Sequence, residues 1–238
     1  FWEGDLFLVL VKDMARRLRA VGCPKEKIRQ IHLGVDLHRF PFRQRRRPRG
    51  RQKIKLLYCG RLVEKKGVLD ALIAFAGLAQ KWDNLVFRIV GDGPLRQTVS
   101  NAVCRLGLED RVVLKGAVSH VRAIQEMQDA HLFVLPSRTA RNGDMEGTPT
   151  VLIEAQALGM PVVSTHHADI PEVVSDGRSG FLVREGDCRA LADRLDHLLS
   201  HPETWSVLGK SGRAHVEHHY NIHSQVHTLE NVYDELLP

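Results

Sequence analysis

The chain has 238 residues, 43% of them hydrophobic, which is enough to bury a sizeable core in one domain or in a domain plus part of another. No run of about 20 apolar residues occurs, and the short apolar run near the start lacks the features of a secretory signal. We therefore expect a cytoplasmic protein. Because the chain opens without methionine, inside an apparent strand, we also expect a piece of something longer.

The net charge of +6 comes from one segment of the chain. Between Arg43 and Lys55 there are six arginines, two lysines and no acid, so the rest of the chain carries a net charge of −2. The segment has no interleaved aromatic residues and no DNA-binding motif, so we do not expect a nucleic-acid partner. Two interpretations stay open: a solvated linker, or a contact with a phosphate-rich partner or the inner face of the plasma membrane.

Residues 1–40 are predicted to form a strand, a helix and a second strand, followed by a Gly–Val–Asp turn. We interpret them as the end of an N-terminal domain and its crossover. Residues 41–53, rich in arginine and proline, are predicted to be a basic linker.

From residue 54 onward, short apolar runs alternate with segments of helical spacing. The expected strands are 54–60, 84–91, 111–116, 131–137, 161–165 and 180–183. The expected helices between them are 67–82, 94–108, 120–130 and 148–159. Continuous apolarity predicts strands buried on both faces, and the alternation predicts an α/β fold: a Rossmann-like, doubly wound parallel sheet with helices on both faces. We assign this domain to 54–186.

Residues 187–238 are predicted to form three helices with no further strand. We expect them to pack over the sheet or to reach a neighbouring domain.

The loop after the first strand of this domain carries two cations. Arg61 and Lys66 lie five residues apart in a glycine-bounded loop before a helix, which suits a diphosphate. The alternative is a pair of solvated surface cations.

The next two loops are ambiguous when taken singly. The sequence Gly–Asp–Gly–Pro at 91–94 is typical of a tight turn, and it lacks the GxGxxG pattern of dinucleotide sites. The loop at 116–120, which contains Val118, could meet the edge of a base, or Ser119 could cap the following helix.

The fourth loop brings two glutamates, Glu146 and Glu154, seven residues apart. Glu146 precedes a helix expected to start near Thr148, whose first amides would point outward. Glu154 lies in an apolar run, where a carboxylate needs hydrogen-bond donors, such as a vicinal diol, unless it faces solvent. Histidine pairs such as His166–His167 lack the spaced ligand set of a metal site, so we expect none.

Taken together, the motifs resemble the C-terminal, donor-binding domain of the family-4 (group 1) retaining glycosyltransferases of the GT-B fold. The matching stretches run in the family order over about 54–184: YCGRLVEKKG, FRIVGDGPL, VVLKGAVSH, LFVLPS, MEGTPTVLIEAQALGMPVVST and IPEVVSDGRSGFLV. The longer, polar stretch SRTARNGDMEGTPT resembles the variant found in enzymes of exopolysaccharide or colanic-acid-like assembly. About half of a typical family member is missing.

The resemblance implies a role for each loop. Arg61 and Lys66 would hold the donor diphosphate and balance its growing charge, and Glu154 would bind the ribose hydroxyls. Glu146 would bind the transferred sugar, and Val118 would lie at the base edge. The remaining donor contacts are expected from Gly147, Thr148, Pro149 and Thr150.

The implied reaction moves a sugar from a nucleoside diphosphate, of the UDP or GDP type, to an acceptor hydroxyl with retention and without an essential metal. The acceptor, a sugar or lipid-linked sugar, would bind through the missing N-terminal domain. Two alternatives are a non-catalytic nucleotide-binding module and a dinucleotide-dependent oxidoreductase domain, the latter disfavoured by the absence of GxGxxG.

Overall fold

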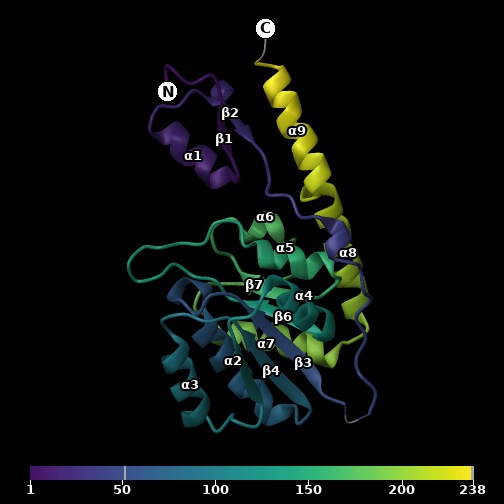
Figure 1. The fold of residues 1–238 in the computed structure, drawn as a ribbon. Helices are drawn as coiled ribbons and strands as arrows, with labels where there is room; N and C mark the ends of the chain where they lie inside the picture. The colour runs from purple at the N-terminus through teal and green to yellow at the C-terminus, as the bar shows by residue number, and fades with distance from the viewer. Residues whose placement is uncertain (51, 237–238) are drawn as a thin grey trace.

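The computed structural model describes residues 1–50 and 52–236. Its centre is a parallel sheet with the strand order β5-β4-β3-β6-β7-β8 (Figure 1). The strands are β3 (Ile54–Cys59), β4 (Leu85–Val90), β5 (Val112–Gly116), β6 (Leu132–Leu135), β7 (Val162–Thr165) and β8 (Gly180–Val183). Each lies within its expected range, and the Rossmann-like α/β fold is confirmed.

Helices cover both faces of the sheet. They are α2 (Val68–Lys81), α3 (Arg96–Arg105), α4 (His120–Asp129), α5 (Thr150–Ala157), α6 (Ile170–Val173), α7 (Cys188–Ser200) and α8 (Thr204–His219). α2 packs against α3 and α7, and α5 packs against α8. Parallel crossovers are right-handed, so the direction in which the chain moves along the sheet decides which face each helix covers. α2 and α3 lead from β3 toward β5 and cover one face. α4 and α5 lead in the opposite direction, toward β6 and β7, and cover the other face.

The strands are apolar on both sides because both sides are covered. Every residue of β6 and β7 is buried, and in β3 only Lys55 and Cys59 are partly exposed. Complete burial of a Val, Leu, Ile or Phe side chain contributes about 1.5–3 kcal/mol, so these runs account for the sheet's position at the centre of the core.

The direction of chain progression reverses between β3 and β6. From β3 the chain builds outward to β4 and β5, then returns to place β6 on the other side of β3. Ligands in open α/β sheets bind at such a reversal, outside the carboxyl ends of the strands. The loops that meet there are 60–67, after β3, and 136–149, after β6.

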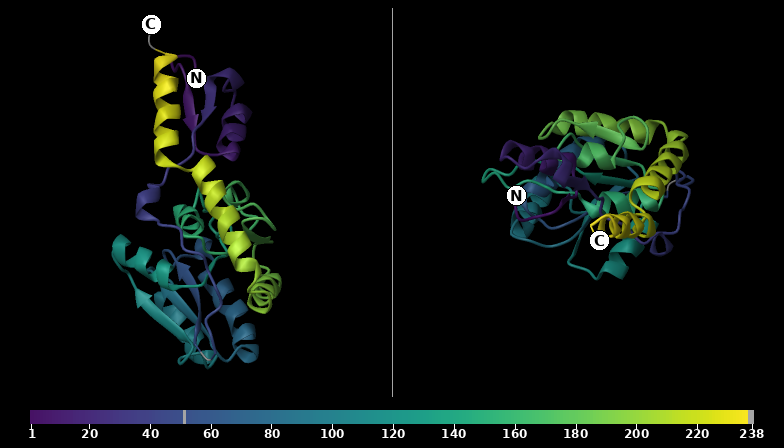
Figure 2. Two further views of the ribbon diagram at one scale, coloured as in Figure 1. Left: turned by 90° about the vertical axis from the view of Figure 1, so that its right-hand side faces the viewer. Right: turned by 90° about the horizontal axis from the view of Figure 1, so that it is seen from above.

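The start and end of the chain form a separate unit. β1 (Phe7–Val9) and β2 (Ile28–Gln30) pair in parallel beside α1 (Lys12–Ala20), and α9 (Ile222–Asp234) runs alongside them (Figures 1 and 2). The His32 amide donates to the Gln225 side chain at 2.9 Å. Of the three C-terminal helices, α7 and α8 therefore pack on the sheet domain, whereas α9 packs on residues 7–35.

The chain crosses between the two units at two adjacent places. The Val35 amide donates to the Tyr220 carbonyl at 2.7 Å, and the Ile222 amide donates to the Val35 carbonyl at 3.1 Å. Gly34 lies so close to Ile222 that an added Cβ would overlap its backbone. The two crossing segments are therefore hydrogen-bonded to each other.

The 41–53 segment is not simply a solvated linker. Arg45 is buried at 4% exposure, and its guanidinium donates to the carbonyls of Gln128 and Ala130, both at 2.7 Å, and of Leu158 at 3.2 Å. These carbonyls lie at the carboxyl ends of α4 and α5, where carbonyls lack helical partners. Arg45 thus fastens the segment to the sheet domain. None of the helices in 1–50 and 52–236 has the length and hydropathy needed to span a bilayer.

Candidate donor site at the carboxyl edge of the sheet

Lys66 and Glu146 meet where the sheet reverses direction. Lys66 ends the loop after β3, and its Nζ forms an ion pair with Oε2 of Glu146, from the loop after β6. The two side chains are only 17% and 8% exposed. Ser137 Oγ approaches the same carboxylate oxygen at 3.5 Å. The structure therefore brings together two predicted residues 80 positions apart, each balancing the other's charge.

Gly67 allows the loop after β3 to pass close to Pro136, the residue that follows β6. It is the N-cap of α2 with φ of 65°, in the left-handed region, and an added Cβ would overlap the carbonyl of Pro136. Only glycine fits both the dihedral angle and the close approach. This turn places Lys66 next to the loop that carries Glu146.

Arg61 stands free at the mouth of the same site. Its side chain is exposed and makes no hydrogen bond or ion pair with any described residue. Its carbonyl accepts a hydrogen bond of 3.1 Å from the hydroxyl of buried Tyr58, which fixes the backbone beneath it. The loop thus offers one cation with its donors unused beside a second that is already paired.

A buried histidine fixes the loop that carries Glu146. His167 Nε2 accepts from the Glu146 amide at 3.0 Å, and its Nδ1 bonds Glu185 Oε1 at 2.6 Å. Because Nε2 is an acceptor, the proton is on Nδ1. The other oxygen of Glu185 accepts from the Thr139 amide at 2.8 Å. One His–Glu pair therefore holds both ends of 139–146.

The charge state of Glu185 follows from these bonds. Its partial burial raises the pKa, but the hydrogen bonds from the Thr139 amide and from His167 lower it more, and the net pKa lies below the ordinary value. Sequence reasoning considered His167 only as a possible metal ligand and did not identify Glu185. The two residues lie 18 positions apart in the sequence, so no local sequence pattern could indicate their contact.

The helix after this loop begins two residues later than expected. α5 starts at Thr150 with Pro149 at the N-cap position, so Gly147 and Thr148 belong to the extended loop. The amides of Gly147, Thr148 and Thr150 donate to no described residue, and the Thr148 hydroxyl is buried without a partner. Proline has no amide to contribute. Unused donors therefore lie beside Glu146, as a site for an anion or a sugar requires.

Glu154 is held by a chain of two further residues. Its carboxylate bonds His120 Nε2 at 3.1 Å, and His120 Nδ1 accepts from the guanidinium of Arg39 at 3.0 Å. The Glu154 side chain is only 13% exposed, so it does not lie on a solvent face. One carboxylate oxygen is left for another donor. Neither Arg39 nor His120 was predicted, because each acts through another side chain.

The loops around Val118 and Gly91 support this edge. Ser119 Oγ accepts from the Arg122 amide at 3.3 Å and caps α4, while Val118 lies half-buried against the core. Gly91 and Gly93 pack so closely on 60–62 that an added Cβ would clash with its backbone. Both glycines serve tight loop packing, and the base-edge role of Val118 stays a prediction.

A cavity of about 180 Å³ lies between this edge and the N-terminal unit. Glu146, Gly147 and Thr148 line one side, and Asp13 and Arg17 of α1 line another. Asp169 also lines it; burial first, then the charges of Glu172 and Asp13, raise its pKa to about 6. Within the described residues, no group of three or more His, Cys, Asp or Glu side chains is placed to hold a metal ion.

Comparison with known proteins agrees with this architecture. The sequence model for glycosyl transferases group 1 matches residues 41–215. The chain is 40% identical over 223 residues to a protein of Escherichia coli K12 assigned to colanic acid biosynthesis as the glycosyltransferase WcaL, covering 93% of this chain and 54% of WcaL. It is 35% identical over 236 residues to the amylovoran biosynthesis glycosyltransferase AmsK of Erwinia amylovora, covering 99% of this chain and 58% of AmsK.

Solved structures share the fold. The Anabaena protein HepE, crystallised with UDP and glucose, superposes with a TM-score of 0.80 at 20% identity, covering 97% of this chain and 63% of HepE. A parallel sheet whose direction of progression reverses, with polar side chains at the reversal point, defines a Rossmann-like α/β protein. The chain belongs to the group 1 glycosyltransferase family, and it spans a little over half the length of the curated relatives it matches.

Proposed function

We propose that this chain is the donor-binding part of a retaining glycosyltransferase that moves a sugar from a nucleoside diphosphate to an acceptor hydroxyl. The observation that carries the proposal is the pairing of Lys66 with Glu146 at the reversal point of the sheet, in a loop that also carries Arg61, whose side chain has no partner among the described residues. A diphosphate needs cations and amide donors, and a sugar needs a carboxylate acceptor. The site provides all three within two loops.

Charge balance assigns a role to each group. The bound diphosphate would draw Arg61 and Lys66 to its oxygens and so release the Glu146 carboxylate toward sugar hydroxyls. As the glycosidic bond breaks, negative charge grows on the leaving diphosphate. Cations and amides placed beside it would therefore stabilise the transition state more than they stabilise the bound substrate. Two cations in one loop, together with the unused amides at the start of α5, make a divalent metal unnecessary in this proposal.

The nucleoside end would lie at Glu154. Its free carboxylate oxygen can accept from ribose hydroxyls while His120 holds the other oxygen. Val118, half-buried in the next loop, would face the base edge. Gly147, Thr148 and Thr150 supply the unused amides, and Pro149 positions the start of the helix.

The acceptor and the setting extend the proposal beyond this chain. The relatives named for colanic acid and amylovoran biosynthesis support a role in cell-surface polysaccharide or glycolipid assembly. A sugar or lipid-linked sugar would bind through protein outside this chain, on the cytoplasmic side and at the inner face of the plasma membrane. A uridine donor and a guanosine donor are both candidates, and both are tested.

Calorimetric titration tests the proposal. UDP, GDP and ADP, then their sugar nucleotides, are titrated without divalent metal and again with magnesium. We expect one diphosphate to bind selectively in both buffers. In Arg61→Ala we expect about tenfold weaker binding of that diphosphate, since charge-assisted hydrogen bonds contribute about 1.5–3 kcal/mol, and a smaller loss for the monophosphate.

The exposed Arg105 on α3 provides the matched control, because Arg105→Ala removes the same charge away from the site. Equal losses of diphosphate and monophosphate binding in Arg61→Ala would remove Arg61 from the distal phosphate. Binding that appears only with magnesium would contradict the metal-independent mechanism.

A further inference from the structure

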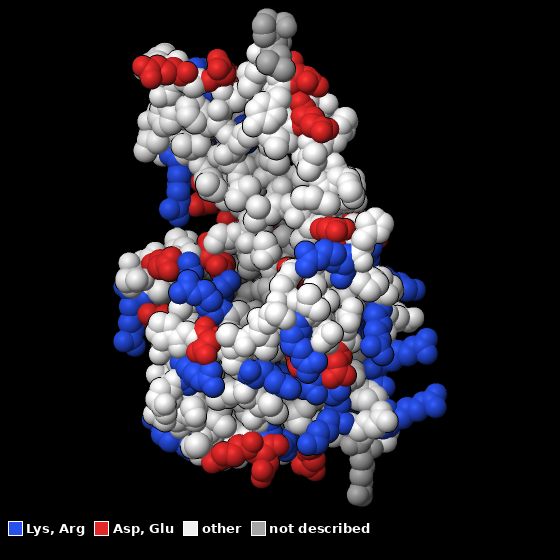
Figure 3. All heavy atoms as spheres, in the orientation of Figure 1, with Lys and Arg blue, Asp and Glu red and all other residues white. Residues whose placement is uncertain are grey.

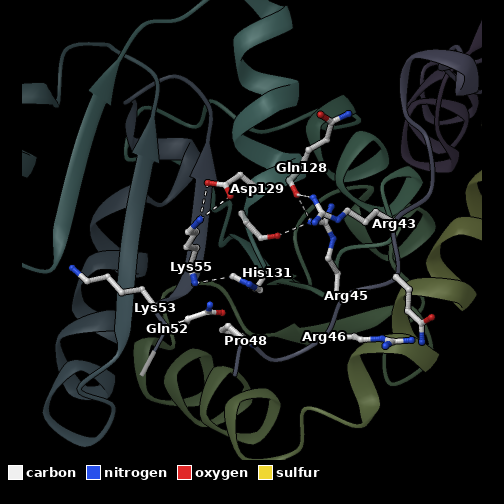
Figure 4. A pocket seen from close by; sticks show the side chains of 12 residues that line it. Arg43, Arg45, Arg46, Pro48, Gln52, Lys53, Lys55, Gln128, Asp129 and His131 are labelled. Carbon is white, nitrogen blue, oxygen red and sulfur yellow. Dashed lines mark hydrogen bonds and ion pairs between the residues drawn. The ribbon is translucent and has the colours of Figure 1, made fainter. Parts of the chain in front are cut away.

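A second polar cavity lies at the opposite end of the sheet. Its volume is about 560 Å³, and it lies where β3 and β6 begin, at their amino ends (Figure 4). β3 has six residues, so about 20 Å of sheet separates this cavity from the carboxyl edge. The cavity is therefore distinct from the candidate donor site.

Cations are the largest group among the twelve residues that line the cavity. Five come from the basic segment and the start of β3: Arg43, Arg45, Arg46, Lys53 and Lys55. Asp129 is the only carboxylate among the residues that line it. Figure 3 shows Lys and Arg side chains gathered along the lower right flank, where this segment runs in Figure 1.

Asp129 is already occupied by two cations. Its carboxylate accepts from Lys55 Nζ at 2.7 and 2.8 Å and from Arg88 at 2.6 Å. Arg46 and Lys53 make no hydrogen bond or ion pair with a described residue, and Figure 4 shows them extending from opposite sides of the cavity, so their charges are unbalanced at its rim. The excess of positive charge thus remains after every observed contact is counted.

Two donors in the lining also lack partners. Arg45 is buried, and its Nε has no hydrogen-bond partner among the described residues. His131 Nδ1 accepts from the Lys55 amide at 3.0 Å, so the proton is on Nε2, which bonds no described residue. Figure 4 shows His131 between Lys55 and Arg45. Unused donors among cations are what an oxyanion requires.

Neighbouring cations add to the effect of burial on two titrating groups of the lining. Burial first, then the charge of Arg43, lowers the pKa of Arg45 to about 10. Burial first, then the charges of Lys55 and Arg45, lowers the pKa of His131 to about 4. An anion in the cavity would offset the part of both shifts that comes from the cations.

We propose that this cavity binds the phosphate group of an anionic ligand, with Arg46 and Lys53 supplying charge at its rim and His131 Nε2 donating from within. The same chemistry fits the headgroup of an anionic phospholipid and a soluble phosphorylated molecule. The site does not depend on the proposed function, because it shares no residue with the donor site.

Two binding assays on the whole chain test the proposal, with inorganic phosphate followed by calorimetry and with vesicles of phosphatidylglycerol and phosphatidylcholine followed by sedimentation. We expect saturable phosphate binding that falls about tenfold or more in Arg46→Gln/Lys53→Gln. Vesicle binding should fall about 30-fold in the same variant, given the usual contribution of each cation near an anionic surface. Phosphate binding without sedimentation would identify a soluble ligand as the source, and both together a headgroup.

Two controls separate the cavity from general basicity. Arg105→Gln/Arg189→Gln removes two exposed arginines that lie outside the cavity, and it should change neither assay. A loss of binding in Arg61→Ala would report phosphate held at the carboxyl edge, whereas the loss in Arg46→Gln/Lys53→Gln reports phosphate held in the cavity. Equal losses in the cavity and control variants, or no phosphate binding by the unaltered chain, would overturn the proposal.

A gain of affinity completes the test, because misfolding cannot produce one. Asp129→Asn removes the only carboxylate of the lining and frees Lys55, so phosphate should bind several-fold more tightly. His131→Asn keeps an acceptor for the Lys55 amide but removes the Nε2 donor, so phosphate should bind more weakly. Unchanged affinity in both variants would show that phosphate does not enter the cavity.

Discussion

Replacing Lys66 by methionine tests whether Glu146 depends on its partner. The substitution keeps the length of the side chain and removes its charge, leaving the Glu146 carboxylate, 8% exposed, with only the 3.5 Å approach of Ser137. Breaking a buried pair by removing one partner costs about 3–5 kcal/mol. Because Lys66 is 17% exposed, we expect about 3 kcal/mol, the lower end of that range.

The measurement is a double-mutant cycle by guanidinium denaturation. For a chain of this size, about 3 kcal/mol lowers Tm by about 6–12 °C. Lys66→Met/Glu146→Gln removes both charges, and we expect it to recover about 2 kcal/mol of the free energy of unfolding.

The neighbouring residue supplies the control. Lys65 pairs with Asp144 at 3.0 Å, but that carboxylate is 55% exposed. Lys65→Met should therefore cost less than about 1 kcal/mol. A coupling energy below about 0.5 kcal/mol between Lys66 and Glu146 would refute the reasoning, because it would mean that solvent already screens the pair.

Three further substitutions have definite expected outcomes. Gly67→Ala should destabilise the fold by about 1–2 kcal/mol or more, because it adds left-handed strain and an overlap with the Pro136 carbonyl. The control Gly77→Ala, in open space within α2, should instead stabilise the fold by about 0.5–1 kcal/mol. Equal effects of the two substitutions in denaturant titrations would contradict the role of Gly67. Asp169 has a pKa of about 6 in the folded chain and about 4 in the unfolded chain, so between these pH values the folded chain holds a proton that the unfolded chain has released, and its stability should fall as the pH rises. In Asp169→Asn the free energy of unfolding, measured from pH 4 to 7, should depend less on pH. An unchanged pH dependence would mean that another group titrates. His120→Phe removes the donor to Glu154 and should weaken binding of the preferred nucleoside diphosphate about fivefold by calorimetry, whereas unchanged affinity would show that His120 does not position the carboxylate.

The sequence was sufficient for the strands of the sheet, and it singled out four charged residues of the candidate site, Arg61, Lys66, Glu146 and Glu154. The strands are short apolar runs whose burial explains their composition, so their positions could be predicted without tertiary information. Arg61, Lys66 and Glu146 could be singled out because polar residues after buried strands of a parallel sheet gather at one edge. Their roles as ligand-binding residues stay predictions.

The residues that support the site could not be found in this way. His120, His167 and Glu185 act through contacts with residues distant in sequence, and a lone histidine near an apolar run has no periodic signature. Arg45 was one of six arginines in a segment with two open interpretations, and only the fold shows that its side chain is buried against helix-end carbonyls, one of which, that of Gln128, Arg43 also reaches. The direction of α9 likewise depends on residues 32–35, far from it in sequence.

The double crossing at Val35 and Tyr220–Ile222 has a mechanical consequence. Two covalent connections lie side by side and hydrogen-bond to each other, so the N-terminal unit is tethered to the sheet domain by a two-stranded joint. A single strand would permit twisting, whereas a paired joint favours bending about the line through both strands. Any such bend would change the width of the 180 Å³ cavity between α1 and Glu146, and it would have to break the hydrogen bonds that the Lys12 amide and the Gln30 side chain donate to Glu172.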